Sequence, residues 1–259
     1  MIDEPYRWVE AIANRREYIE SELAAGSPTI ALSCEEGILF LTFGKDRKKI
    51  FEIYDQIALG GIGHPGDIER LRMMAIELAS TEGFARSVND VSLRRMATYS
   101  FSPALKQAFE QVYGAPYLAR LLFAEVGAQP TDDLFVTLDY DGSMTANSMG
   151  AGKGRDHFGV ISGSRRSAEQ IAMFLRKEPV EPFKSALATA IKAWGIGLYS
   201  LDEDHSEILS DDELKSFLKS QLKDYTLEAA LLERKPKTRI AFTELNDATL
   251  QAALSEYEG

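Results

Sequence analysis

Two hydroxyl side chains, Ser27 and Thr29, lie in the stretch GSPTIALSC, where polar residues give way to a strand-like apolar run. A hydroxyl becomes a strong nucleophile when a neighbouring base takes its proton, and a free α-amino group at a chain end can be that base. Lys49, further along the chain, is another basic residue that can support such chemistry. The pattern therefore raises the question of whether Ser27 or Thr29 attacks a peptide bond once the preceding residues are removed.

The local sequence gives both hydroxyls a simpler role. Neither residue carries a free α-amino group, because each stands inside the chain. Pro28 directly follows Ser27 and stiffens the segment that would have to attack. We therefore expect Thr29 to be a β-branched residue at the start of a strand and Ser27 to be a polar residue after the end of a helix.

The motifs give no support to metal or cofactor chemistry. The three histidines, His64, His157 and His205, lie far apart, without the carboxylate spacing of a zinc site or of a Ser-His-Asp triad. The stretch GAGKG resembles part of a phosphate-binding loop. However, Asn147 stands where the first glycine should be, and Gly154 follows the lysine in place of Ser or Thr. We expect neither a metal nor a cofactor.

Length, composition and charge limit the class of protein. With 259 residues, of which 45% are hydrophobic, the chain can bury a sizeable core, and we expect a single domain over residues 1–259. The formal net charge of -11 disfavours nucleic acid and anionic membranes as partners. Cys34 is the one cysteine, so no internal disulfide forms, and no signal-peptide or membrane-spanning pattern is visible. We therefore expect a cytoplasmic protein.

The hydrophobic periodicity predicts a mixture of helices and strands. Trp8, Ile12, Ile19 and Leu23 recur at helical spacing, which indicates an amphipathic helix over residues 8–24. In chain order we then expect strands at 29–34, 37–43, 48–55 and 56–63, helices at 67–84 and 91–113, strands at 117–127, 133–146 and 157–164, helices at 167–176 and 183–199, strands at 226–235 and 237–242, and a helix at 246–257. This order suits two antiparallel sheets packed face to face between helices.

Residues 201–225 form a segment rich in Asp and Glu, LDEDHSEILSDDELKSFLKSQLKDY. We interpret it as an acidic surface insertion. Asp211 or Asp212 is placed to cap a short helix that ends near Leu222.

The chain contains, in this order, the stretches GSPTIAL, EEGILFLTF, KKIFEIYDQIALGGIG, GDIERLR, DYDGS, HFGVISGS and LEAALLERKPKTRIAFTELNDATLQAAL. Together they resemble the alpha-type subunit of the 20S proteasome in its bacterial, actinobacterial-like form, nearly from end to end. The resemblance implies an α+β fold, the four-layer αββα sandwich of the N-terminal nucleophile hydrolase superfamily, with an N-terminal helix on the ring surface. The chain departs from the family in the GAGKGRD stretch and in the acidic segment.

The resemblance also bears on the two hydroxyls. When Gly37 is aligned with the glycine of the first hairpin in catalytic beta-type subunits, Ser27 falls at their nucleophile and Thr29 falls too late. Lys49 matches their lysine, but the acidic residue that orients this lysine falls at Phe43, and a phenyl ring cannot orient an ammonium group. The resemblance thus implies no catalytic residue here. The activity of this threonine-type endopeptidase complex would belong to its beta-type subunits.

The resemblance implies a docking pocket for the C-terminal tails of ring ATPases or other activators. By position its residues are Gly26, Lys49 and Gly63, with His64 beside them. An ammonium group can pair with a terminal carboxylate, and glycine lets a peptide backbone approach closely. From residue type alone, Lys49 is a solvated lysine at a strand end, and Lys48 can take its place.

Residues 1–7 match the segment that narrows the axial pore in the family, with Asp3, Pro5 and Tyr6 as gate residues, although any frayed terminus looks similar. The implied partners are further copies in a homo-oligomeric, seven-membered ring, beta-type subunits, an activator, and unfolded protein substrates. Two alternatives remain open. One is a self-processing hydrolase with Ser27 as nucleophile, and the other is a divergent ring-forming homologue without a beta-type partner.

Overall fold

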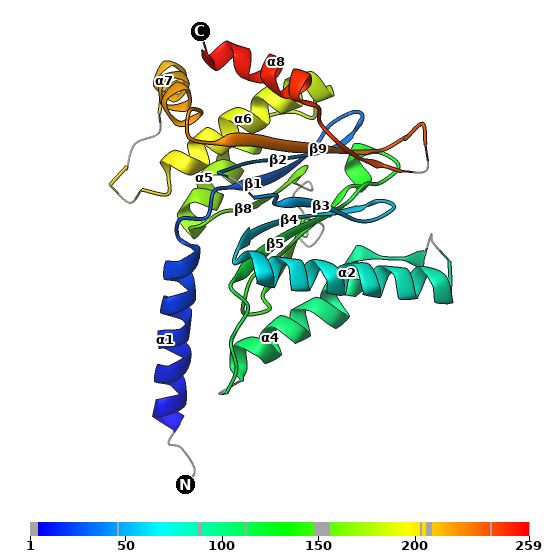
Figure 1. Ribbon diagram of the computed structural model, residues 1–259, viewed down its shortest axis with the longest axis vertical. Helices are drawn as coiled ribbons and strands as arrows, with labels where there is room; N and C mark the ends of the chain where they lie inside the picture. Colours follow the sequence, from blue (N-terminus) through cyan, green and yellow to red (C-terminus); the bar gives the residue numbers. More distant parts are fainter. Residues whose placement is uncertain are drawn as a thin grey trace.

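Two antiparallel sheets stack face to face at the centre of the molecule (Figure 1). The structure is a computed structural model, and it describes residues 5–45, 47–87, 90–111, 113–147, 156–202, 204–205, 209–238 and 240–258. The first sheet has the order β10-β9-β2-β1-β8, formed by β1 (Thr29–Ser33), β2 (Gly37–Gly44), β8 (Phe158–Ile161), β9 (Thr226–Glu233) and β10 (Phe242–Glu244). The second has the order β3-β4-β5-β6-β7, formed by β3 (Ile50–Tyr54), β4 (Ile57–Gly63), β5 (Ala119–Glu125), β6 (Leu134–Leu138) and β7 (Met144–Ala146).

Helices cover the outer face of each sheet. The first sheet carries α5 (Arg165–Leu175) and α6 (Phe183–Tyr199), and beyond them lie α7 (Asp211–Gln221) and α8 (Asp247–Glu258) (Figure 1). The second sheet carries α2 (Pro65–Ala85), α3 (Leu93–Met96), the π-helical turn η2 (Ala97–Phe101) and α4 (Ser102–Glu110), and the short η3 (Pro130–Asp132) precedes β6. None of the helices in the described part of the chain combines the length and apolar character that crossing a membrane requires.

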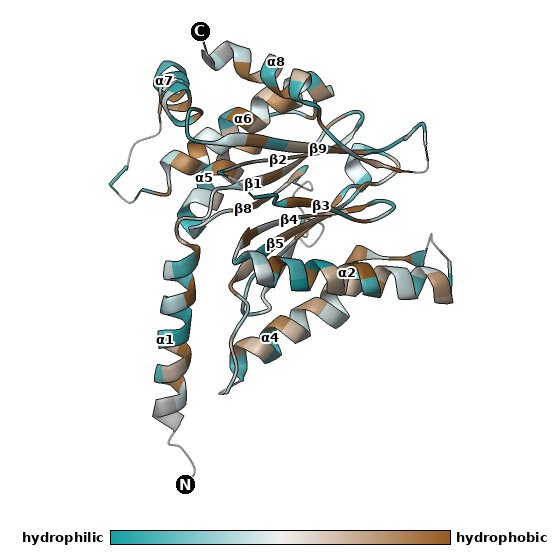
Figure 2. Ribbon diagram, in the orientation of Figure 1, coloured by the Kyte–Doolittle hydropathy of each residue, from teal (hydrophilic) through white to brown (hydrophobic). Residues whose placement is uncertain are grey.

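The alternation of side chains along each strand divides the core into layers. In β1, Ile30 packs with Trp194 beneath α6, whereas the next residue, Ala31, packs between the sheets with Phe40 and Leu122. Both faces of the first sheet are therefore covered, and β2 is buried along its whole length. Figure 2 shows the result, with apolar central strands and helices whose polar residues face outward.

The structure confirms most of the predicted elements and corrects three of them. The first helix, α1 (Pro5–Leu23), begins before the predicted residue 8, so residues 5–7 of the predicted pore segment have helical backbone. The prediction of one helix over 91–113 is wrong, because the π-helical turn η2 separates α3 from α4. The strand predicted at 237–242 is displaced, and β10 begins only at Phe242. Ahead of it the Thr238 hydroxyl bonds the amide of Ile240 in a local turn. Residues 148–155, which hold the whole GAGKG stretch, lie outside the described residues.

The acidic segment is not only a surface feature. Its helix α7 buries Leu214 and Leu218 in the core cluster beneath α6. The predicted cap at Asp211 or Asp212 is wrong, because Ser210 is the capping residue. The Ser210 amide donates to a Glu213 carboxylate oxygen at 2.9 Å, and the Ser210 hydroxyl donates to the same oxygen at 2.6 Å. Ser210 and Glu213 thus form a capping box.

Replacing Ser210 by alanine is expected to lower the free energy of unfolding by about 1 kcal/mol, because Ser and Asp are preferred at this position and alanine supplies no cap. Urea denaturation followed by circular dichroism measures the change. Ser216→Ala, in the interior of the same helix, is the matched control, since that hydroxyl bonds only the Asp212 carbonyl within α7. An equal loss in both variants would contradict the assignment of the cap.

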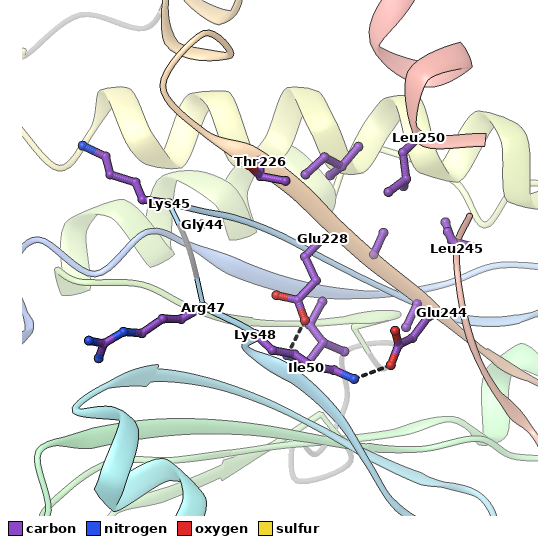
Figure 3. A pocket seen from close by; sticks show the side chains of 13 residues that line it. Gly44, Lys45, Arg47, Lys48, Ile50, Thr226, Glu228, Glu244, Leu245 and Leu250 are labelled. Atoms are coloured by element: carbon purple, nitrogen blue, oxygen red, sulfur yellow. Dashed lines mark hydrogen bonds and ion pairs between the residues drawn. The ribbon is translucent and has the colours of Figure 1, made fainter. Parts of the chain in front are cut away.

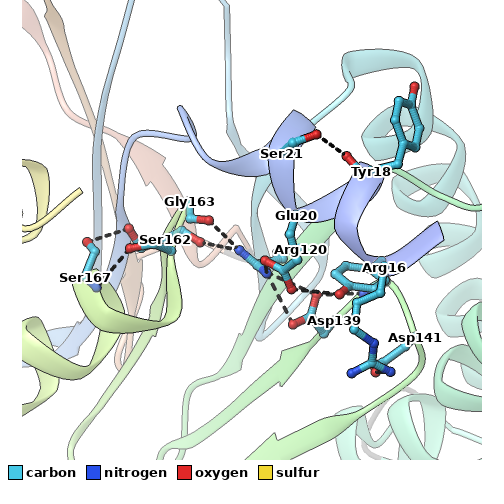
Figure 4. A network of polar contacts seen from close by, with 12 residues as sticks. Arg16, Tyr18, Glu20, Ser21, Arg120, Asp139, Asp141, Ser162, Gly163 and Ser167 are labelled. Carbon is cyan, nitrogen blue, oxygen red and sulfur yellow. Dashed lines mark hydrogen bonds and ion pairs between the residues drawn. The ribbon is translucent and has the colours of Figure 1, made fainter. Parts of the chain in front are cut away.

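Helix α1 extends away from the body and is anchored at its C-terminal end (Figures 1 and 4). Ile19 is fully buried against Tyr140 and its neighbours. Glu20 accepts hydrogen bonds from Arg120 Nη2 at 2.5 Å and from the Tyr140 hydroxyl at 2.7 Å. Burial raises the pKa of Glu20, but these hydrogen bonds and the charge of Arg120 outweigh it and lower the pKa. The result is a fixed exit of the chain from α1 toward β1.

Arg120 is the centre of this anchor. Its Nε donates to Asp139 at 3.1 Å, and its Nη1 donates to the carbonyl oxygens of Ser162 and Gly163 at 3.0 and 2.7 Å. The Gly163 amide in turn donates to the Gly26 carbonyl at 2.9 Å. One buried guanidinium group therefore connects α1, β5, the β6–β7 turn and the residues after β8, and it sets the position of Gly26.

Candidate functional site

Three of the residues predicted for docking, Gly26, Lys49 and Gly63, line one cavity of about 760 Å³. Gly26 follows the end of α1, Lys49 lies in the loop between β2 and β3, and Gly63 is the last residue of β4. The cavity therefore lies where the end of the first helix, the start of β3 and the start of α2 meet. These segments are far apart in the sequence, and the two sheets and the anchor of α1 bring them together.

Both glycines are required by the backbone geometry. Gly63 has a φ of 122°, and a Cβ atom there would lie 2.1 Å from the carbonyl oxygen of Leu118. At Gly26 a Cβ atom would lie 2.9 Å from the carbonyl oxygen of Leu23. The cavity wall at both positions is therefore bare backbone, which another peptide can approach closely.

Both the backbone amide and the side-chain amine of Lys49 are hydrogen-bonded. Its amide donates to the Glu228 carboxylate at 2.9 and 3.2 Å, and the next amide, of Ile50, donates to the same carboxylate at 2.9 Å. Its Nζ donates to the Phe43 carbonyl oxygen at 3.1 Å. Burial lowers the pKa of Lys49 to about 8, although the charge of Glu228 acts in the opposite direction. The amine is thus a partly desolvated cation with an unusually low affinity for its proton.

The rest of the cavity lining is predominantly basic. Three further cations come from the β2–β3 loop: Lys45, Arg47 and Lys48. Among the described lining residues, carboxylates come only from Glu22 and Glu69, and Glu69 already accepts two hydrogen bonds from Arg72 at 2.8 and 2.7 Å. An anionic group is therefore the ligand that this cavity suits best.

The described lining of this cavity does not include the other residues predicted for docking or for the gate. His64 is exposed and precedes α2; its amide donates to the Leu118 carbonyl at 2.7 Å, and it is not among the described lining residues, whereas the adjacent Pro65 is. Asp3, predicted for the gate, lies outside the described residues. Pro5 and Tyr6 have helical backbone in the first turn of α1.

Both candidate nucleophiles are buried and hydrogen-bonded inside the fold. The Ser27 hydroxyl accepts a hydrogen bond from the Trp194 indole at 2.9 Å. The Thr29 hydroxyl donates to the Thr42 hydroxyl at 3.2 Å. Phe43, where the resemblance places a carboxylate in catalytic relatives, packs on the Trp194 ring with centroids 4.0 Å apart. An aromatic pair therefore fills the place in which an orienting carboxylate would have to stand.

The sequence analysis missed Glu228, the residue that fixes the backbone of Lys49. A signal for it exists, because the alternation in TLEAALLE places Glu228 on the same face as Ala230 and Leu232, which pack between the sheets. A carboxylate on an inward face needs donors. Its partners, the amides of Lys49 and Ile50, lie too far along the chain to be identified from the pattern.

The chain is similar to several known proteins that share the name proteasome subunit alpha. The chain is 27% identical to the proteasome subunit alpha of Nocardioides sp. over 249 residues, which cover 95% of this chain and 87% of the relative. It is 30% identical to the protein of the same name from Frankia casuarinae over 200 residues, 73% of this chain and 75% of that one. For Acidothermus cellulolyticus the identity is 31% over 186 residues, 70% and 74% of the two chains. No protein-family model matches the chain.

These similarities agree with the resemblance read from the sequence stretches. The chain therefore belongs to the family of bacterial proteasome alpha-type subunits.

Proposed function

We propose that this chain is the non-catalytic alpha-type subunit of a 20S proteasome core particle, which gates the entry of unfolded proteins and docks the C-terminal tails of a ring ATPase or other activator. The cavity that Lys49 lines together with Gly26 and Gly63 is the observation that carries this proposal. A terminal carboxylate pairs with the ammonium group there, while the tail backbone lies against the glycines.

The layer order supports the fold that this function requires. Helices α5 and α6 lie on the first sheet and α2 and α4 on the second, as expected for the four-layer αββα sandwich of the N-terminal nucleophile hydrolase superfamily. In the proposed assembly, copies of the chain form a seven-membered outer ring in the cytoplasm. Asp3, Pro5 and Tyr6 then stand at the pore as gate residues, and His64 stands at the mouth of the docking cavity.

The surroundings of Ser27 support a subunit without activity of its own. Ser27 is joined to Gly26, so it has no free α-amino group, and its hydroxyl accepts the Trp194 hydrogen bond. Phe43 stands where the resemblance places the orienting carboxylate. Glu228, the carboxylate next to Lys49, accepts the backbone amides of Lys49 and Ile50, while the Lys49 Nζ bonds a carbonyl oxygen. Threonine-type catalysis needs an unmasked terminal amine as base. In the proposed complex, beta-type subunits provide it.

The proposal is tested by assembly. Mixing the purified chain with the beta-type subunit from the same genome is expected to give a large barrel, seen by electron microscopy, in which mass spectrometry finds the residues ahead of Ser27 still attached. Ser27→Ala in this chain is expected to leave proteolysis by the barrel unchanged, whereas removal of the beta-type nucleophile abolishes it.

Two results would contradict the proposal and identify the alternatives. Cleavage between Gly26 and Ser27, with loss of activity in Ser27→Ala, would show a self-processing hydrolase. Rings that form from this chain alone and never take up a beta-type subunit would show a ring-forming homologue with a different role.

A further inference from the structure

The outer edge of β9 is open over the first residues of that strand. The short strand β10 pairs with β9 through Phe242, Thr243 and Glu244, opposite residues 232, 231 and 230. One more hydrogen bond follows, from the Leu245 amide to the Ala229 carbonyl at 3.0 Å. The chain then turns away into α8, as Figure 3 shows near Leu245 and Leu250.

Strand geometry determines which backbone groups face this edge. The Glu233 amide donates to the Ala241 carbonyl at 2.7 Å, so the odd-numbered residues of β9 point toward β10. The Arg234 amide donates to the Glu36 carbonyl at 2.8 Å, so the even-numbered ones point toward β2. The amide and carbonyl of Leu227 therefore face outward beyond the end of β10.

No strand among the described residues pairs with this outward side of Leu227. In the register of β9 and β10 its partner would be Asp247, but Asp247 is already the first residue of α8. An unpaired donor and acceptor on an edge strand form a template for another strand. The edge is thus built to accept backbone hydrogen bonds from a second peptide.

A cavity of about 330 Å³ lies along this edge. Figure 3 shows its walls, with Leu245 and Leu250 on one side of β9 and Lys48 and Ile50 on the other. The floor between them is β9 itself. Because apolar side chains lie on the α8 side and charged ones on the loop side, the cavity offers different environments to alternate side chains of an extended peptide.

The charges at the rim select the kind of peptide. Glu244 is neutralised by an ion pair with Lys48, and Glu228 is occupied by the amides of Lys49 and Ile50. Lys45 and Arg47 line the cavity and are exposed, and no ion pair with a carboxylate is recorded for either within the described ranges. The described lining thus carries three cations, Lys45, Arg47 and Lys48, against the two carboxylates of Glu228 and Glu244, and in a chain with a net charge of -11 this local excess of one positive charge favours an acidic ligand.

We propose that the open edge of β9 at Leu227 binds an extended acidic peptide segment of a partner protein. The segment adds a short strand beside β9, exchanges backbone hydrogen bonds with Leu227, and places acidic side chains against Lys45 and Arg47. Its recognition depends on backbone hydrogen bonds along a strand. The docking cavity shares Lys45, Arg47 and Lys48 with this one, but it suits a terminal carboxylate at Lys49 and not an added strand.

A pair of variants at one position tests the backbone contact. Leu227→Pro removes the outward amide but no amide of the β2 ladder, and proline is tolerated on an edge strand when its nitrogen faces outward. Leu227→Ala loses the same buried side chain and keeps the amide, so it is the matched control. The probe is a fluorescent peptide of alternating Val and Glu, acetylated and amidated so that it has no terminal carboxylate.

Fluorescence anisotropy with the full chain is expected to show binding to the wild type and to Leu227→Ala. For Leu227→Pro we expect binding at least about tenfold weaker, because a hydrogen bond is lost and the ring obstructs the edge. Equal binding by the two variants would overturn the proposal.

Hydrogen exchange in the wild type tests the proposal even if Leu227→Pro does not fold. In the wild type, the amide of Leu227 is expected to exchange more slowly once the peptide is added, and Lys49→Ala is expected to show the same protection. The double variant Lys45→Glu, Arg47→Glu is expected to lose it. Protection by a Val-Lys peptide of equal length would overturn the acidic preference, and protection caused by self-association of the chain would overturn the partner assignment.

Discussion

Asp133→Ala is expected to destabilise the protein by about 3–5 kcal/mol, because it leaves a buried guanidinium group without its counter-charge. The side chains of Asp133 and Arg234 are 0% and 5% exposed. Arg234 Nη1 and Nη2 donate to the two carboxylate oxygens of Asp133 at 2.7 and 3.0 Å. Ser33 Oγ and the Gly127 amide donate to the same carboxylate at 2.7 and 2.9 Å. All four donors lose this carboxylate in the variant, and Arg234 keeps only neutral carbonyl acceptors.

The measurement is the free energy of unfolding from urea denaturation. A domain is stable by only about 5–15 kcal/mol, so a loss of this size is a large fraction of the total. Arg176→Ala is the control, because it breaks an exposed ion pair with Asp156 and is expected to change stability by about 0–1 kcal/mol. The double variant Asp133→Ala, Arg234→Met is expected to be more stable than Asp133→Ala alone. If Asp133→Ala is no worse than the control, the buried pair has no structural importance.

The second large effect is expected at Lys49. Lys49→Ala should abolish activator-stimulated proteolysis by the assembled barrel and leave hydrolysis of small peptides unchanged, because docking is lost while the beta-type sites remain. A charge-assisted hydrogen bond is worth about 1.5–3 kcal/mol, so the tail peptide should bind about 10- to 150-fold more weakly. Lys48→Ala, next to it in the same loop, is the matched control and should weaken tail docking much less, because the Lys48 ammonium group is paired with Glu244. Unchanged stimulation in Lys49→Ala would remove Lys49 from the docking site.

The pH dependence of docking gives an independent test of the role of Lys49. The pKa of Lys49 is lowered to about 8 by burial, and a carboxylate pairs only with the protonated amine. Tail binding is therefore expected to be full well below pH 8 and to weaken as the pH rises through about 8. The charged groups that surround this amine are Glu228 on β9, Glu22 on α1, Glu69 on α2, and Lys45, Arg47 and Lys48 in its own loop. Lys49→Arg keeps its charge, so any tail binding that it retains should not fall at this pH.

Most strands and helices could be predicted from the hydrophobic pattern, because each strand of this fold is covered on at least one face. GILFLTFG is apolar throughout since β2 is buried on both faces, and the sequence shows that directly. Local exceptions were harder to predict. The π-helical turn over ATYSF has no sequence signal of its own. It forms where the chain between α2 and β5 packs on the second sheet.

The candidate site could be predicted only in part. Gly26, Lys49 and Gly63 were identified through the resemblance, and the structure brings them to one cavity. Residue types alone do not distinguish Lys49 from Lys48. The difference arises from Glu228, which is separated from Lys49 by 179 positions in the sequence. The Glu228 carboxylate accepts the Lys49 amide and so holds the loop with the Lys49 side chain directed inward. Long-range contacts of this kind follow from the stacking of the sheets and leave no local pattern.

Helix α1 contacts the body along its C-terminal half, through Arg15 on the carbonyl oxygens of Phe109 and Gln111, Arg16 on Asp141, and Glu20 on Arg120. From Arg15 back to Pro5 the helix measures about 15 Å at a rise of about 1.5 Å per residue. A tilt of about 10° about Arg15 would displace the far end of this segment by about 3 Å on the same geometry. Gly26 lies at the other end of the contacted segment. A small rotation of α1 beside Gly26 would therefore become a larger displacement at the N-terminal end of the helix.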